Sequence, residues 1–107
     1  MTNLFETQDP RGLRVICTKQ QWLDHVLGFH EDDMNGCEQE VQSAIEAPMY
    51  GIIYQDADNA NRCIYYKQKQ GIRAYLKVVV DFDEDVGFVV TAYLIPRPKS
   101  GERPIWP

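Results

Sequence analysis

Two stretches near the C-terminus, residues 72–82 and 86–95, alternate apolar and other side chains with a period of two residues. This period is typical of half-buried β-strands, and the short acidic segment between them predicts a hairpin. If that segment forms a three-residue loop, aliphatic residues line one face of the hairpin. The other face then carries the facing pairs Lys77–Thr91 and Tyr75–Tyr93.

The rest of the chain divides into a helical part followed by more strands. Apolar residues recur at helical spacing over residues 19–29, directly after a capping-box pattern formed by Thr18 and Gln21. A second helix is expected from a cap at Asn35 through Glu46. Further short strands are predicted at residues 13–17, 50–54 and 62–68.

This order of elements predicts an α+β fold, in which two N-terminal helices pack on one face of a mainly four-stranded antiparallel sheet. The opposite sheet face is expected to be open. With 107 residues, the chain can form one core but not two. We expect an irregular N-terminal arm over residues 1–13, one domain over 14–95 and a tail over 96–107, whose prolines disfavour a strand ladder.

Composition indicates where the protein resides and how its charge is distributed. No apolar run approaches the ~18 residues that cross a membrane, and the N-terminus lacks the pattern of a secretory signal, so a cytoplasmic protein without membrane association is expected. Three cysteines without a CxxC pair predict buried thiols. The net charge is −5, but residues 62–107 hold 8 Lys+Arg against 5 Asp+Glu, a balance of +3. This basic part contains the hairpin.

Basic and tyrosine side chains alternate in the same part of the chain. Such a composition suits the neutralisation of phosphates and the stacking of nucleic-acid bases. Ordinary sheet surface is the alternative, since both residue types are common there, and the residues alone support the two interpretations about equally. The residues concerned are Arg62, Tyr65, Tyr66, Lys67, Lys69, Arg73, Tyr75 and Lys77.

The two histidines are the natural candidates for proton transfer near neutral pH. His25 borders the apolar stripe of the first predicted helix, where a packed structural histidine is the more frequent case. His30 precedes an acidic run and is expected in a surface loop. Their spacing of five residues does not place both rings on one helix face, so neither a metal site nor a cofactor is expected.

Several short motifs follow one another in a recognisable order over residues 14–95. They are the segment 22–30, Ile45-Glu-Ala-Pro48, Ile52-Ile53-Tyr54, Arg62-Cys-Ile-Tyr65-Tyr66, Tyr75-Leu-Lys77-Val-Val-Val80 and Gly87-Phe-Val-Val-Thr91-Ala-Tyr93. This order resembles the phage-associated barnase/EndoU/colicin/RelE-like (BECR) nuclease domains. One departure is that His30-Glu31-Asp32 stands where His-Pro-Glu would be expected.

The resemblance implies a metal-independent endoribonuclease of toxin or effector type that binds RNA on the open sheet face, with an antitoxin or immunity protein as a further partner. It implies His25 as general base or acid, Lys77 and Arg62 in phosphate stabilisation and Thr91 in phosphate orientation. Tyr93 or Tyr75 would stack a base or transfer the second proton. The RNA contacts expected beside these residues are Arg73, Tyr75, Tyr66 and Lys67.

A second function is also compatible with the sequence. The chain would then be a non-catalytic interaction module that retains the nuclease fold. Its acidic N-terminal half would contact a basic protein, and its Pro-rich tail would dock on a partner.

Overall fold

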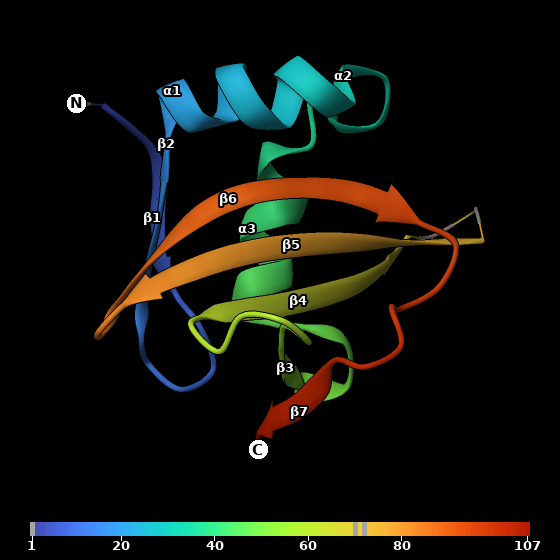
Figure 1. Cartoon of the computed structure of the whole chain (residues 1–107). Helices are drawn as coiled ribbons and strands as arrows, with labels where there is room; N and C mark the ends of the chain where they lie inside the picture. Colours follow the sequence, from blue (N-terminus) through green and yellow to red (C-terminus); the bar gives the residue numbers. More distant parts are fainter. Residues whose placement is uncertain (1, 70, 72) are drawn as a thin grey trace.

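The computed structural model describes residues 2–69, 71 and 73–107 (Figure 1). Within these residues, seven strands form one mixed, mainly antiparallel sheet in the order β1-β2-β6-β5-β4-β3-β7. The strands are β1 (Asn3–Gln8), β2 (Arg14–Thr18), β3 (Ile53–Gln55), β4 (Arg62–Lys69), β5 (Ala74–Asp83), β6 (Val86–Ile95) and β7 (Arg103–Trp106). The helices are α1 (Lys19–Gln21), the π-helical η1 (Trp22–Leu27), α2 (Gly28–Met34), α3 (Glu38–Glu46) and the 3-10 turn η2 (Met49–Gly51).

The α+β class and the mainly antiparallel pairing are confirmed, but the sheet has seven strands rather than the four that were predicted, and one pair of strands is parallel. Residues 3–8, expected to be irregular, form β1 and pair with β2, while β2 runs parallel to β6. The Pro-rich tail contributes β7, which pairs with β3 at the edge of the sheet. An edge strand tolerates proline because one side of it needs no ladder donors. Ile72, the predicted start of the hairpin, lies outside the described residues.

The helical boundaries also differ from the prediction. The side chain of Thr18 accepts a hydrogen bond from the backbone N–H of Gln21 at 3.1 Å, as a capping residue should. The first helical segment then continues through η1 and α2 to Met34 rather than ending near residue 29. Asn35 closes this segment instead of opening the next one, because its N–H donates to the carbonyl of Glu31 at 3.0 Å.

The predicted hairpin register is wrong. The turn holds two residues rather than three, and an irregularity between Val79 and Val80 shifts the pairing again. Lys77 therefore faces Tyr93 instead of Thr91. Because the two shifts together move the register by two positions, the polar and aromatic side chains beyond the bulge remain on one face of the sheet.

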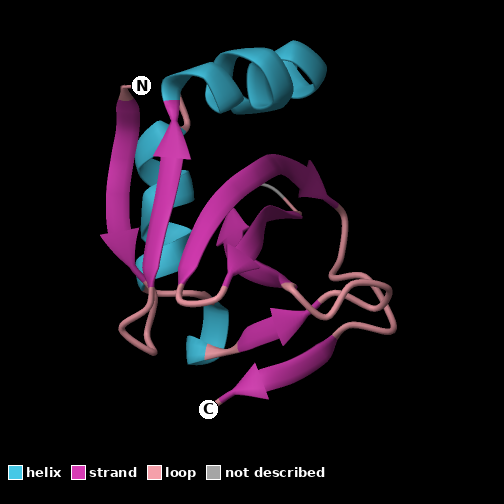
Figure 2. Cartoon of the chain, turned by 60° about the vertical axis from the view of Figure 1, so that its left-hand side comes forward, coloured by secondary structure: helices cyan, strands magenta, loops and turns pink. Residues whose placement is uncertain are grey.

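The two helical segments cover different parts of the sheet (Figure 2). Helix α3 packs across one face through Val41, Ala44 and Ile45, which belong to the main core. Strand β2 pairs with residues 86–88 at the start of β6. The rest of β6 is therefore free of that neighbour, and the segment α1–η1–α2 lies along it. No helix among the described residues is long and apolar enough to span a membrane.

A buried carboxylate holds the turn between β1 and β2. Asp9 accepts hydrogen bonds from the Arg11 guanidinium at 2.7 and 3.0 Å and from the Tyr65 hydroxyl at 2.8 Å. Its other oxygen accepts the backbone N–H groups of Arg11 and Leu13 at 2.8 and 3.2 Å. This carboxylate is fully buried and fully paired, so it is a structural residue that ties the N-terminal hairpin to β4.

We expect the Asp9→Ala substitution to lower the free energy of unfolding by about 3 kcal/mol, because it leaves a partly buried guanidinium and a buried phenol without their acceptor. Urea unfolding followed by circular dichroism measures this loss. Asp83→Ala, at an exposed position, is the control and should unfold close to the wild type. Equal midpoints for both variants would contradict the structural role of Asp9.

Candidate functional site

Four side chains from four elements form a row across the sheet face opposite α3. Tyr66 of β4 and Lys77 of β5 are direct cross-strand partners, as are Lys77 and Tyr93 of β6. The His30 ring of α2 stacks on the Tyr93 ring, with centroids 5.0 Å apart and 28° between the planes. We call Tyr66, Lys77, Tyr93 and His30 the cross-strand row. It brings a cation, two phenols and an imidazole into one place.

The backbone of the first helical segment explains why His30, and not His25, joins this row. Residues 22–27 are π-helical, and His30 has the non-helical dihedral angles φ −134° and ψ 33°. A π-helix and a kink both alter the direction in which later side chains project. A regular helix of 100° per residue, on which the prediction for His25 rested, therefore does not apply. His25 is exposed, and its ring lies 6.1 Å from that of Phe29.

Lys77 is almost completely buried, with 4% of its surface exposed. Its Nζ atom donates to Glu102 Oε2 at 2.7 Å and lies 5.9 Å from the ring centroids of both Tyr66 and Tyr93. The Glu102 side chain is itself only 1% exposed. The ammonium is thus neutralised by a carboxylate and flanked by two aromatic rings, an arrangement in which cation–π attraction adds to the ion pair.

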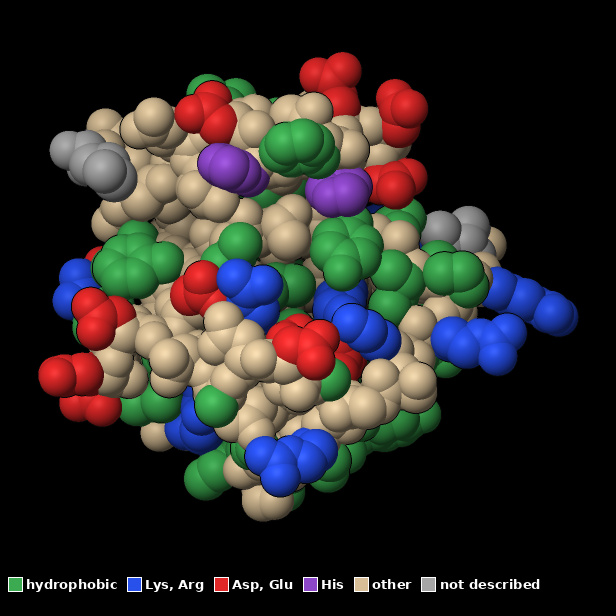
Figure 3. Space-filling model, in the orientation of Figure 1, with side chains coloured by type: hydrophobic (Ala, Val, Ile, Leu, Met, Phe, Trp, Pro, Cys, Tyr) green, Lys and Arg blue, Asp and Glu red, His purple; other side chains and the backbone are tan. Residues whose placement is uncertain are grey.

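The segment between β6 and β7 covers this end of the sheet face. The Tyr66 hydroxyl donates to Glu102 Oε1, and the backbone N–H of Lys99 donates to the Tyr66 hydroxyl at 3.1 Å. The expectation of an open face is therefore wrong at the cross-strand row. Figure 3 shows this side of the molecule, where acidic, basic and apolar groups meet over the strands and both histidines (purple) lie along the helical edge above them.

Tyr66 has an altered acidity as a result. Burial, and then the hydrogen bond to Glu102, raise the pKa of the Tyr66 phenol well above its usual value. The phenol therefore stays protonated and acts as a hydrogen-bond donor to an acidic oxygen.

The other predicted site residues lie outside the cross-strand row. Thr91 faces Val79, and Tyr75 faces Ile95, so they belong to neighbouring rows on the same face. Arg62 donates to Asp81 at 2.8 Å and is four residues from Tyr66 along β4, a separation of about 13 Å. Arg73 is exposed at the start of the hairpin.

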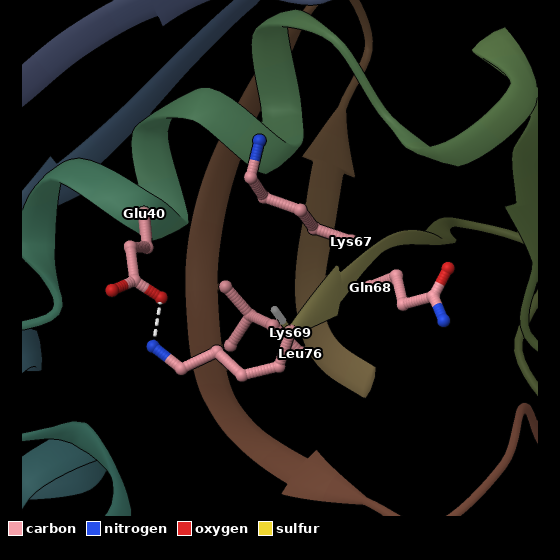
Figure 4. Close-up of a pocket in the computed structure, with 5 residues that line it drawn as sticks. All are labelled: Glu40, Lys67, Gln68, Lys69 and Leu76. Carbon is pink, nitrogen blue, oxygen red and sulfur yellow. Dashed lines mark hydrogen bonds and ion pairs between the residues drawn. The ribbon is translucent and has the colours of Figure 1, made fainter. Parts of the chain in front are cut away.

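Lys67 points to the opposite face from Tyr66, as strand alternation requires. It donates to the Ser43 hydroxyl at 3.0 Å, beside a hollow of about 380 Å³ between α3 and the end of β4 (Figure 4). Lys69 and Glu40 also line this hollow and form an ion pair with each other. The cations of β4 are therefore divided between the two faces, and the predicted RNA contacts do not form one surface.

Sequence reasoning missed two members of this site. Glu102 is separated from Lys77 by 25 positions, and its local signal was weak, namely a single acidic residue in a basic, Pro-rich segment. His30 was expected in a surface loop. In the part of the chain that the structure describes, no group of three His, Cys, Asp or Glu side chains is arranged to hold a metal ion.

Comparisons of this chain with protein-family models, curated proteins and solved structures found no match.

The raised pKa values of Tyr65 and Tyr66 predict a loss of stability at alkaline pH. Both phenols are buried, and in each the neutral form is favoured in the folded state. Their contribution is complete below the ordinary pKa of 10.0 and is lost as the pH rises above it. In an ultraviolet titration, we expect the phenols of Tyr65 and Tyr66 to ionise only when the protein unfolds. Tyr66→Phe should remove one of these late-ionising groups and Tyr50→Phe neither. A titration of the folded wild type that shows no late-ionising phenol would contradict this prediction.

Proposed function

We propose that this chain is a metal-independent endoribonuclease of toxin or effector type with a BECR-like fold. It would bind single-stranded RNA on the face opposite α3 and cleave it by attack of a ribose 2′-OH on the adjacent phosphodiester. One observation carries the proposal: the cross-strand row brings Lys77, two phenols and His30 together on one sheet face. The order of sequence motifs that resembles BECR nucleases supports it independently.

The chemistry assigns a role to each member of the row. Cleavage through the 2′-OH needs a base for that hydroxyl, an acid for the leaving 5′-oxygen and positive charge near the phosphate. Lys77 supplies the charge, and the neutral Tyr66 phenol donates a hydrogen bond to a phosphate oxygen. His30, oriented by its stacking on Tyr93, accepts the proton of the 2′-OH, and the Tyr93 phenol gives a proton to the leaving 5′-oxygen. The imidazolium then returns its proton to the phenolate. Thr91, in the next row, is placed to orient the phosphate or ribose.

Exposed cations near the same end of the sheet would attract the RNA backbone. Arg73 precedes β5, and Arg97 follows β6, whose ends meet where Tyr75 pairs with Ile95. The negative net charge of the whole chain therefore does not determine the electrostatic potential at the cross-strand row.

Incubation with single-stranded RNA in the presence of EDTA tests the activity. We expect cleavage products that end in a 2′,3′-cyclic phosphate, and no cleavage of the corresponding DNA, which lacks the nucleophile. His30→Ala should reduce the rate by about 10² or more, the usual contribution of a proton-transfer group. His25→Ala is the matched variant on the same helical segment, and a larger loss there would assign the role to His25. Intact RNA at high concentrations of folded wild-type protein would refute the proposal.

A second function is favoured by a different surface. Leu23 and Phe29 are 60% and 74% exposed on the first helical segment, although both are large and apolar. Phe29 also lines a hollow of about 350 Å³ that extends from Leu27 to Asp33, together with the acidic residues Glu31, Asp32 and Asp33. Exposed apolar groups next to a run of negative charge suit a basic protein partner. The chain would then act as a non-catalytic interaction module.

Substitution of Phe29 by Ser tests this second function. A protein partner isolated on the immobilised chain should bind the Phe29→Ser variant more weakly by calorimetry. Its affinity should also fall with added salt when Glu31, Asp32 and Asp33 are intact, and less so when they are changed to amides. Tyr50→Ser, which removes an equally exposed aromatic side chain outside the first helical segment, serves as the control. Undiminished binding of the Phe29→Ser and amide variants would exclude this surface as the contact.

A further inference from the structure

We infer that Glu102 occupies the position of an RNA phosphate in the cross-strand row, and that the C-terminal segment 96–107 is a built-in inhibitor that RNA must displace. This inference rests on the proposed function. It identifies what the row binds, namely a phosphodiester, and what controls access to it.

The contacts of Glu102 are those that a phosphate would make. One carboxylate oxygen accepts from the Lys77 ammonium at 2.7 Å, and the other accepts from the Tyr66 hydroxyl. A phosphodiester presents the same features, a single negative charge shared by two acceptor oxygens. A site that satisfies both oxygens of a carboxylate with a cation and a neutral donor is therefore suited to either anion.

Stability alone does not account for this ion pair. Burial of a lysine and a glutamate costs desolvation energy that their attraction roughly repays, and apolar residues of similar volume stabilise such positions as well or better. A neighbouring row of the same face has such an apolar pair, in which Ile64 of β4 faces Val79 of β5. The polar pair in the middle of this apolar face therefore indicates a binding role for Lys77.

The segment that carries Glu102 is held by a limited set of contacts. Strand β7 is exposed along its length, and among the described residues its one partner strand is the three-residue β3 at the sheet edge. Ile105 and Trp106 each remain 38% exposed. Displacement of β7 would leave the main core under α3 intact, and elements with few buried contacts open at a lower free energy than the core.

Binding of a 2′-O-methyl RNA oligonucleotide, which cannot be cleaved through a blocked 2′-oxygen, tests the inference by fluorescence anisotropy. Glu102→Gln should bind at least about tenfold more tightly than the wild type, because the competing anion is removed. Glu102→Asp should also bind more tightly, although it keeps the charge, since its shorter side chain reaches Lys77 less well. Glu84→Gln, an equal charge change in the exposed hairpin turn, should bind as the wild type does.

Hydrogen exchange of the wild-type protein provides a measurement that needs no variant. Saturation with the same oligonucleotide should increase amide exchange in residues 103–106 as β7 leaves the sheet. Unchanged or slower exchange there would overturn the inference, as would folded Glu102 variants that bind no more tightly than Glu84→Gln.

The two proposals fail in different ways. Cleavage by the wild type without tighter binding by the Glu102 variants would leave the nuclease and remove the inhibitor. Tighter binding and β7 displacement without any cleavage would leave a masked phosphodiester site and remove the nuclease.

Discussion

The buried ion pair between Lys77 and Glu102 determines how the last third of this molecule is arranged. A buried lysine in the central strand β5, flanked by aromatic rings, favours a nearby counter-ion because an unpaired ammonium is costly in such surroundings. The chain supplies it from a segment 25 positions later. The return of that segment across the sheet places residues 103–106 beside β3, so the seventh strand and the covered face have the same cause.

Local patterns predicted most strands but not their pairing. Residues 86–95 are the strand that alternation indicated, and β4 differs from its prediction by one residue. Alternation cannot reveal a bulge, and a bulge together with a tighter turn moved Lys77 from Thr91 to Tyr93. The rule against proline in a ladder holds for interior strands, whereas β7 lies at the edge, where Pro104 faces Tyr54.

The sequence predicted the part of the candidate site that depends only on which face of the sheet a side chain occupies. Alternation along the strands placed Lys77 and Tyr93 on one face, and the structure adds that they are direct neighbours. The sequence pattern could not choose between the histidines, because a π-helical turn and a kink at His30 break the regular helical spacing. Nor could it find Glu102, since a contact between distant charged residues leaves no periodic trace in the sequence.

The ion pair also bears on how an acidic protein could bind RNA. Five of the cationic side chains form ion pairs within the described residues, those of Arg11, Arg14, Arg62, Lys69 and Lys77. Among these, only the Lys77 pair joins the sheet to the C-terminal segment. If a phosphodiester replaces Glu102, one negative charge replaces another, and Lys77 never becomes a buried unpaired ion. The exchange then depends on the difference between two anions and on the contacts of β7, not on the large cost of exposing a buried charge.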